Sequence, residues 1–97
     1  MITVDFSIHE RGLFSGRKTA TALRGELIVD DGVNDQKLVL RTRHDQLVTS
    51  SFFLGLLLPH VMGYGSYRAM SGLVDDSGLD EVSKLEWYRC CRRHFGL

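Results

Sequence analysis

Two short runs near the start of the chain have the alternation of a β-strand. Apolar side chains occupy every second position of residues 2–9, which predicts a half-buried strand. Residues 37–42 (KLVLRT) predict a second strand, and apolar side chains on both of its faces favour a central position in a sheet. A loop with two glycines over residues 10–16 follows the first strand.

The segment between these strands fits two interpretations. Apolar side chains recur at helical spacing in residues 17–29, which predicts a short helix with Gly25 as a weak point. The alternative is a strand over residues 26–29 that turns through an Asp-Gly dipeptide into residues 37–40 as a hairpin. Because the linker 30–36 is longer than a tight hairpin needs, we expect the helix.

The middle of the chain carries the longest apolar run. Residues 51–58 (SFFLGLLL) are apolar almost all round, which predicts a buried helix that ends or kinks near Leu58, before Pro59. A glycine turn follows, and we expect a strand over residues 66–70. Residues 75–78 (DDSG) then predict another turn.

A final helix is expected at residues 79–95. Trp87, Cys91 and Phe95 are spaced four apart, so they share one side of this helix and are expected to pack on the sheet, while three arginines lie on the other side. Acidic residues at its start and arginines near its end suit the helix dipole.

The resulting order is β-α-β-α-β-α, which predicts an α/β fold with a small mixed or mainly parallel sheet covered by helices. The length of 97 residues fits a single domain over residues 1–97. Twelve basic and twelve acidic side chains balance, which argues against a general binder of nucleic acid or anionic membranes. The adjacent Cys90 and Cys91 cannot staple distant parts of a fold, and they suit a reducing compartment, so we expect a cytoplasmic protein with no membrane segment.

One segment combines a strand, paired hydroxyls and a buried helix. In QLVTSSFFLGLL, residues 46–57, the chain runs from apolar residues through Thr49, Ser50 and Ser51 into the apolar helix. This pattern resembles the STAS and STAS-like domains, whose best-known members are bacterial anti-anti-sigma factors. The resemblance covers about residues 2–70. The Ser51-Phe52 pair matches the STAS-like branch, in which an aromatic residue follows the serine.

The resemblance implies a non-catalytic regulatory module without a cofactor. By position, Ser51 is the residue that a partner kinase would phosphorylate, with Ser50 beside it. The partner implied is a serine kinase of the histidine-kinase-like ATPase type or an anti-sigma-like regulator. The residues expected to contact the partner, through the serine loop and the following helix, are Asp45, Thr49, Phe52 and Phe53.

Physical chemistry supports a charge-sensitive site at this place whatever the family. A hydroxyl at a helix N-terminus lies among unpaired backbone N–H groups, where a phosphate is well accommodated and adds nearly two negative charges. The segment around it, residues 36–74, carries four basic side chains and one acidic side chain. The simpler interpretation is that Ser50 and Ser51 only cap a core helix.

Two other classes of function remain open. Aromatic residues interleaved with arginine in the last helix, Trp87, Arg89, Arg92 and Arg93, are a possible contact for nucleic acid or a protein partner, although packing of the aromatic side chains on the sheet is the simpler explanation. The second open class is a small inhibitor protein of the kind that phages and mobile elements encode, which would act by covering a surface of another protein. We expect no metal site, because Cys90 and His94 have no second ligand pair.

Overall fold

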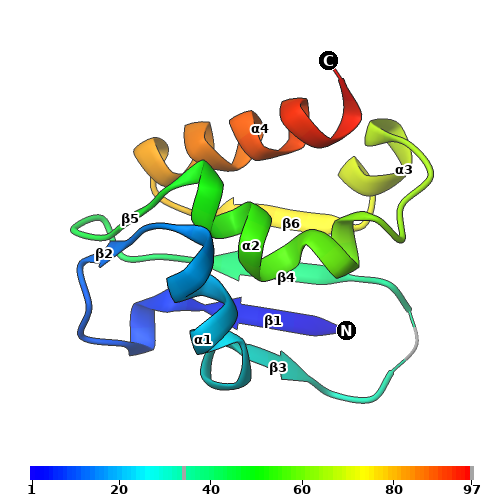
Figure 1. The fold of residues 1–97 in the computed structure, drawn as a ribbon. Coiled ribbons are helices and arrows are strands. Elements are labelled where there is room, and N and C mark those ends of the chain that lie inside the picture. Colours follow the sequence, from blue (N-terminus) through cyan, green and yellow to red (C-terminus); the bar gives the residue numbers. More distant parts are fainter. Residues whose placement is uncertain (34, 97) are drawn as a thin grey trace.

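The computed structural model describes residues 1–33 and 35–96. The strands of this part are β1 (Ile2–Asp5), β2 (Leu13–Phe14), β3 (Ile28–Asp30), β4 (Leu38–Arg41), β5 (Leu47–Val48) and β6 (Val74–Gly78). The helices are the 3-10 helix η1 (Phe6–Ile8) and the α-helices α1 (Arg17–Leu27), α2 (Ser50–Val61), α3 (Tyr67–Ser71) and α4 (Glu81–Phe95) (Figure 1).

The main sheet is mixed and has the strand order β3-β1-β4-β6. The three strands β1, β4 and β6 are parallel, with Val4 opposite Leu40 and Leu38 opposite Val74. At the edge, β3 runs antiparallel to β1. The short strands β2 and β5 form a separate parallel pair. The predicted α/β class with a mixed sheet is therefore confirmed, as is the central position of β4.

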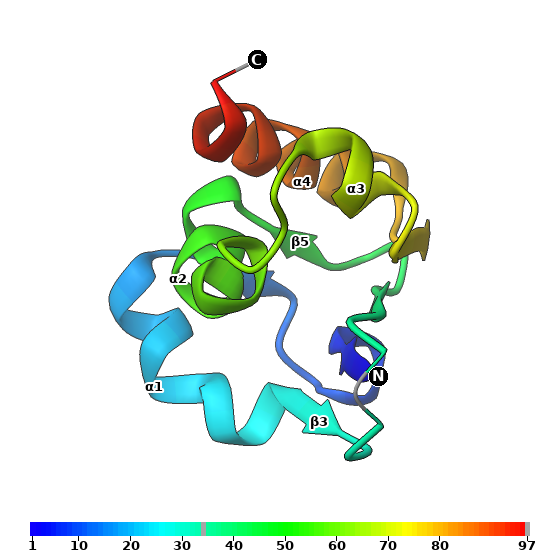
Figure 2. The same cartoon turned by 90° about the vertical axis from the view of Figure 1, so that its right-hand side faces the viewer.

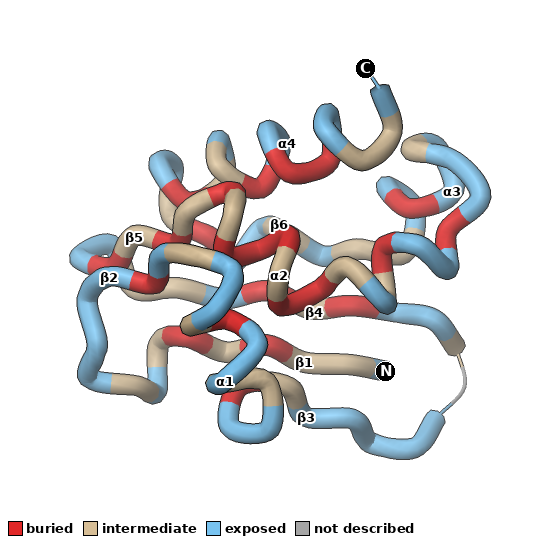
Figure 3. Tube along the Cα trace, viewed as in Figure 1, coloured by how far each residue is buried: buried red, intermediate tan, exposed pale blue. Residues whose placement is uncertain are grey.

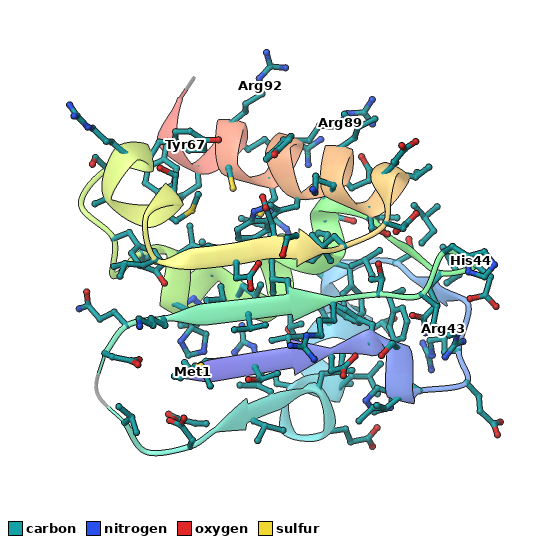
Figure 4. All side chains as sticks on the ribbon, turned by 180° about the vertical axis from the view of Figure 1, so that it is seen from behind. Met1, Arg43, His44, Tyr67, Arg89 and Arg92 are labelled. Atoms are coloured by element: carbon teal, nitrogen blue, oxygen red, sulfur yellow. The ribbon has the colours of Figure 1, made fainter. Side chains whose placement is uncertain are left out.

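The helices lie on one side of this sheet. In Figure 1, α1 and α2 cross in front of the strands and α4 runs along the β6 side; the view from behind in Figure 4 has the strands nearest the viewer. Figure 2, turned by a quarter, shows α2 almost end-on between α1 and α4. Figure 3 shows buried residues in β1 and β4 and along most of α2. The fully buried core includes Val4, Phe6, Phe14, Leu40, Phe52, Phe53, Leu56, Leu57 and Trp87.

The first strand is shorter than the alternation predicts. β1 ends at Asp5, and residues 6–8 form η1. The Asp5 carboxylate accepts a hydrogen bond from the Ser7 backbone N–H at 3.0 Å, which closes the turn. Phe6 is buried but Ile8 is 75% exposed, so the apolar positions no longer share one face after the strand ends.

The segment over residues 17–40 contains the expected helix and also a strand. α1 occupies Arg17–Leu27, which confirms the helix. The strand β3 follows it directly, but it pairs with β1 rather than with β4, so the hairpin is wrong. Because β1 lies between β3 and β4 in the sheet, the chain must cross over β1 after β3 before it can form β4.

Two expectations between residues 66 and 78 are wrong. Residues 67–71 form the helix α3 instead of a strand, because the Ser66 hydroxyl accepts the Ala69 N–H at 3.1 Å and caps it. Residues 74–78 form the edge strand β6 instead of a turn. An edge strand pairs on one side only and tolerates the polar sequence VDDSG, which has no strand-like alternation.

Pro59 does not end α2, which continues to Val61. A proline inside a helix leaves the carbonyl four residues earlier without its N–H donor. That carbonyl belongs to Gly55, and here it accepts a hydrogen bond from the Arg24 guanidinium of α1 at 2.5 Å. A side chain of the neighbouring helix therefore replaces the missing backbone donor.

Candidate functional site

The start of α2 is held at the end of the small β2–β5 ladder. β5 ends at Val48, and the Thr49 N–H donates to the Phe14 carbonyl at 3.0 Å. Thr49 is the helix cap, since its hydroxyl accepts the Phe52 N–H at 3.3 Å. The hydroxyl-rich sequence TSS is thus fixed between a strand end and a helix start, as the sequence predicts.

The two serines differ in accessibility. Ser50 is buried, with 8% of its surface exposed, while Ser51 is half-buried. The Ser51 hydroxyl lies 3.2 Å from that of Thr49, so the two hydroxyls share a hydrogen bond. Ser51 is therefore the more accessible hydroxyl of the two serines, and the cap role belongs to Thr49 rather than to either serine.

Ser51 lies on the side of α2 that faces the start of α1. It precedes Gly55 by four residues and so shares its face of the helix. Gly55 is packed against α1: a Cβ at that position would lie 3.0 Å from the Arg17 Cα. Figure 1 shows the starts of α1 and α2 at the same end of the molecule. An exposed arginine, Arg17, therefore begins the helix beside the serine site.

A buried glutamine organises the loop that precedes β5. The Gln46 side chain amide donates to the carbonyls of Phe6, His9 and Arg11 at 2.7, 3.1 and 3.1 Å. Its oxygen accepts the Arg43 N–H at 2.8 Å. Sequence reasoning missed Gln46, because nothing in the pattern separates a buried glutamine from an exposed one.

Asp45 is on the exposed side of the same loop. Its carboxylate accepts a hydrogen bond from the Arg43 guanidinium at 3.0 Å, and this contact holds the pKa of Asp45 below its usual value. Figure 4 shows Arg43 and His44 together at this end of the sheet. Asp45 is thus a charged, exposed group in the loop that leads through β5 to the serine site.

Phe52 and Phe53 do not form part of this surface, and their expected contact with a partner is corrected here. Both side chains are fully buried. Phe52 packs against Phe14 with ring centroids 5.5 Å apart, and Phe53 packs against Trp87 at 5.4 Å. These contacts fix the start of α2 to the core. Neither side chain is therefore exposed to a partner.

In α4 the aromatic Trp87 is buried, whereas the arginines are exposed. Trp87 is 1% exposed, so it is not available to stack on a base; its possible role as a contact is corrected, and the simpler expectation that it packs in the core is confirmed. Arg89, Arg92 and Arg93 are exposed. They lie toward the end of α4, whereas its beginning is tied to β5 through Ser83, whose hydroxyl accepts the Val48 N–H at 3.2 Å.

The thiols and cavities add no second site near Ser51. Burial raises the pKa of Cys90 and of Cys91 to about 12, so both thiols stay neutral and are poor nucleophiles. A cavity of about 310 Å³ lies at the other end of α2, lined in part by Pro59, His60 and Tyr64. Among residues 1–33 and 35–96, no three His, Cys, Asp or Glu side chains gather as a metal ligand set.

No helix in the described part of the chain has the length and apolar character needed to cross a membrane. Comparison with protein-family models, with curated proteins and with solved structures yields no match, so the functional argument rests on the chain's own residues.

Proposed function

We propose that this chain is a STAS-like regulatory module that binds a protein partner and is switched by phosphorylation of Ser51. The observation that carries the proposal is the position of the Ser51 hydroxyl. It is accessible in the first turn of a twelve-residue helix whose remaining early residues are locked in the core. The sequence around it resembles the phospho-acceptor segment of STAS-like domains.

A phosphate on Ser51 changes the surface without unfolding the helix. The first N–H groups of α2 and its dipole favour negative charge at this place. The added charge of nearly −2 lies on the face of α2 that packs toward the start of α1, where Arg17 is exposed, and it alters what a partner meets there. A partner that fits the neutral hydroxyl then rejects the phosphorylated form through desolvation and like-charge repulsion.

The partner proposed is a serine kinase of the histidine-kinase-like ATPase type, or an anti-sigma-like regulator, in the cytoplasm. The chain acts by binding rather than by catalysis. Two features support this. The accessible chemical group at the site is a hydroxyl whose neighbour is another hydroxyl rather than a base. The two thiols, which are the strongest nucleophiles of the chain, are buried.

Paired affinity capture tests the switch. Three baits are compared in lysate of the native cells: the unchanged protein, Ser51→Ala and Ser51→Glu. We expect one partner to bind the first two baits and to be lost at least about tenfold with Ser51→Glu, the loss that about 1.4 kcal/mol of repulsion produces. Ser71→Glu is the matched control, because Ser71 is an exposed serine at the end of α3.

The control separates charge at the site from charge in general. Ser71→Glu is expected to keep the partner. A partner that binds Ser51→Glu as well as the unchanged protein contradicts the switch and favours simple surface occlusion. Thermal unfolding of each bait shows whether a lost interaction reflects a lost fold.

A further inference from the structure

The outer side of α4 carries an exposed stripe opposite its buried face. At about 100° per residue, Glu81, Leu85, Tyr88 and Arg92 fall on one side of the helix, about 100° to about 160° around the helix axis from the buried Trp87. Leu85 is 61% exposed and Tyr88 is 40% exposed, and Val82 at the border of the stripe is 55% exposed. Large apolar side chains thus remain in water on a helix whose other side is fully packed.

A hollow lies beside this stripe. Tyr67, Leu85, Tyr88, Arg89 and Arg92 line a space of about 460 Å³. Figure 4 shows Arg89 and Arg92 extending from α4 away from the sheet, with Tyr67 near the end of the helix. The stripe therefore combines an apolar centre with room for a further side chain.

Acidic side chains gather just before and at the start of α4, and basic side chains gather toward its end. Residues 75–86 carry five acidic side chains and one basic side chain, and residues 87–97 carry three basic side chains and no acidic one. Arg89 pairs with Glu86 at 2.8 Å. In the described part of the chain, neither Glu81 nor Arg92 takes part in an ion pair. Each end of the stripe thus presents a charge that the monomer does not use.

We propose that this stripe binds a second copy of the chain, with the two α4 helices packed antiparallel about a two-fold axis. An axis that passes between Glu86 and Trp87 sets Glu81 opposite Arg92 of the other copy and Leu85 opposite Tyr88. The two residues of each pair then lie at the same height along the helix pair, one from each copy. Such an interface is self-complementary, as a two-fold dimer requires.

The charges at the two ends of the stripe favour a second copy of the chain over a polyanion such as DNA. A polyanion such as DNA meets Arg92 at one end of the stripe but is repelled by Glu81 and its acidic neighbours at the other. A second copy in antiparallel orientation satisfies both ends at once. The hollow beside Tyr88 receives the Leu85 side chain of the other copy, which removes the exposed apolar residues from water.

Sedimentation velocity of the full chain over about 10 µM to about 1 mM tests the proposal, a range suited to the weak association that one helix pair supports. We expect a concentration-dependent dimer. Glu81→Arg and Arg92→Glu, made singly, each place like charges in contact and are expected to weaken association about tenfold. The double variant restores opposite charges in reversed order and is expected to return association to within about threefold of the unchanged chain.

Lys18→Glu is the matched control. Lys18 is exposed on α1, and its substitution changes the net charge by the same amount as Arg92→Glu. It is expected to leave the dimer unchanged. A chain that stays monomeric throughout the range overturns the proposal. So does a dimer that the two single variants do not weaken, or that the double variant does not restore.

Discussion

The Arg24 guanidinium donates a hydrogen bond of 2.5 Å to the Gly55 carbonyl, the group that Pro59 leaves without a helical donor. This contact joins α1 to α2 and carries α2 past the proline to Val61. It comes at a cost, because the Nε atom of Arg24 is buried and has no partner within the described residues. Arg24 is therefore a structural residue, although an arginine on an amphipathic helix is expected to face water.

Arg24→Ala is expected to lower the free energy of unfolding by about 1–3 kcal/mol, because it leaves the Gly55 carbonyl without a donor. Urea unfolding followed by circular dichroism measures the change. In a Pro59→Ala background the new backbone N–H at position 59 supplies the donor, so the same substitution is expected to cost about 1 kcal/mol less. Equal costs in the two backgrounds contradict the compensation.

Close packing of α1 on α2 predicts opposite effects for two glycines. A Cβ at Gly55 would lie 3.0 Å from the Arg17 Cα and 3.1 Å from the Arg17 carbonyl oxygen. Because backbone atoms do not move aside easily, Gly55→Ala is expected to destabilise the protein by about 1–3 kcal/mol. At Gly25, within α1, a Cβ meets open space.

Gly25→Ala is therefore the matched control and is expected to stabilise the protein by about 0.5–1 kcal/mol, since alanine is the better helix former. Urea midpoints of the two variants provide the comparison. A stability change of the same sign in both contradicts the packing described here.

The Gln46 network predicts a large effect from a small change. Gln46→Ala removes a buried amide that serves three carbonyls and one N–H, and about 2–4 kcal/mol of stability is expected to be lost. Gln36→Ala is the control, because the Gln36 side chain is exposed. Since Gln46 positions the loop before α2, hydrogen exchange in residues 42–49 is expected to quicken in the first variant only.

The success of the sequence-based predictions follows the hydrophobic pattern. α4 and β4 have strong periodicity, and both lie close to the predicted positions. β6 was missed because its polar residues carry no alternation; its pairing with β4 is a tertiary property. The continuation of α2 past Pro59 depends on Arg24, thirty-five positions earlier, and local pattern contains no such information.

At the serine site, too, some features can be predicted from the local sequence and others depend on tertiary structure. The order of strand, hydroxyl residues and helix is visible in the sequence, but the assignment of the cap to Thr49 and the burial of Ser50 need the structure. The apolar run predicts a buried helix, but the family resemblance placed Phe52 and Phe53 at a partner contact, and the structure buries both in the core.

The two buried thiols predict a loss of stability at high pH. Desolvation raises the pKa of Cys90 and Cys91 in the folded chain from 9.0 to about 12. A group whose pKa is raised on folding stabilises the fold below its unfolded pKa, and this contribution is lost as the pH rises toward the folded value. The free energy of unfolding is thus expected to fall between about pH 9 and about pH 12, and less steeply in a Cys90→Ala/Cys91→Ala variant compared with its own value at pH 8.

Thiol reactivity provides an independent measurement of the same burial. At pH 8 the folded protein is expected to react with a disulfide reagent at least about a hundredfold more slowly than the urea-unfolded protein, because little thiolate forms and the sulfur atoms are covered. Rapid reaction of either thiol in the folded protein contradicts the placement of α4.

The most direct test of the account is the location of phosphate on the protein isolated from its own cells, by intact mass and by fragmentation of the phosphorylated form. The account predicts a single phosphoryl group on Ser51, retained in Ser50→Ala and absent from Ser51→Ala. Phosphate that maps elsewhere, or an unmodified mass under every growth condition in which the chain is made, contradicts it.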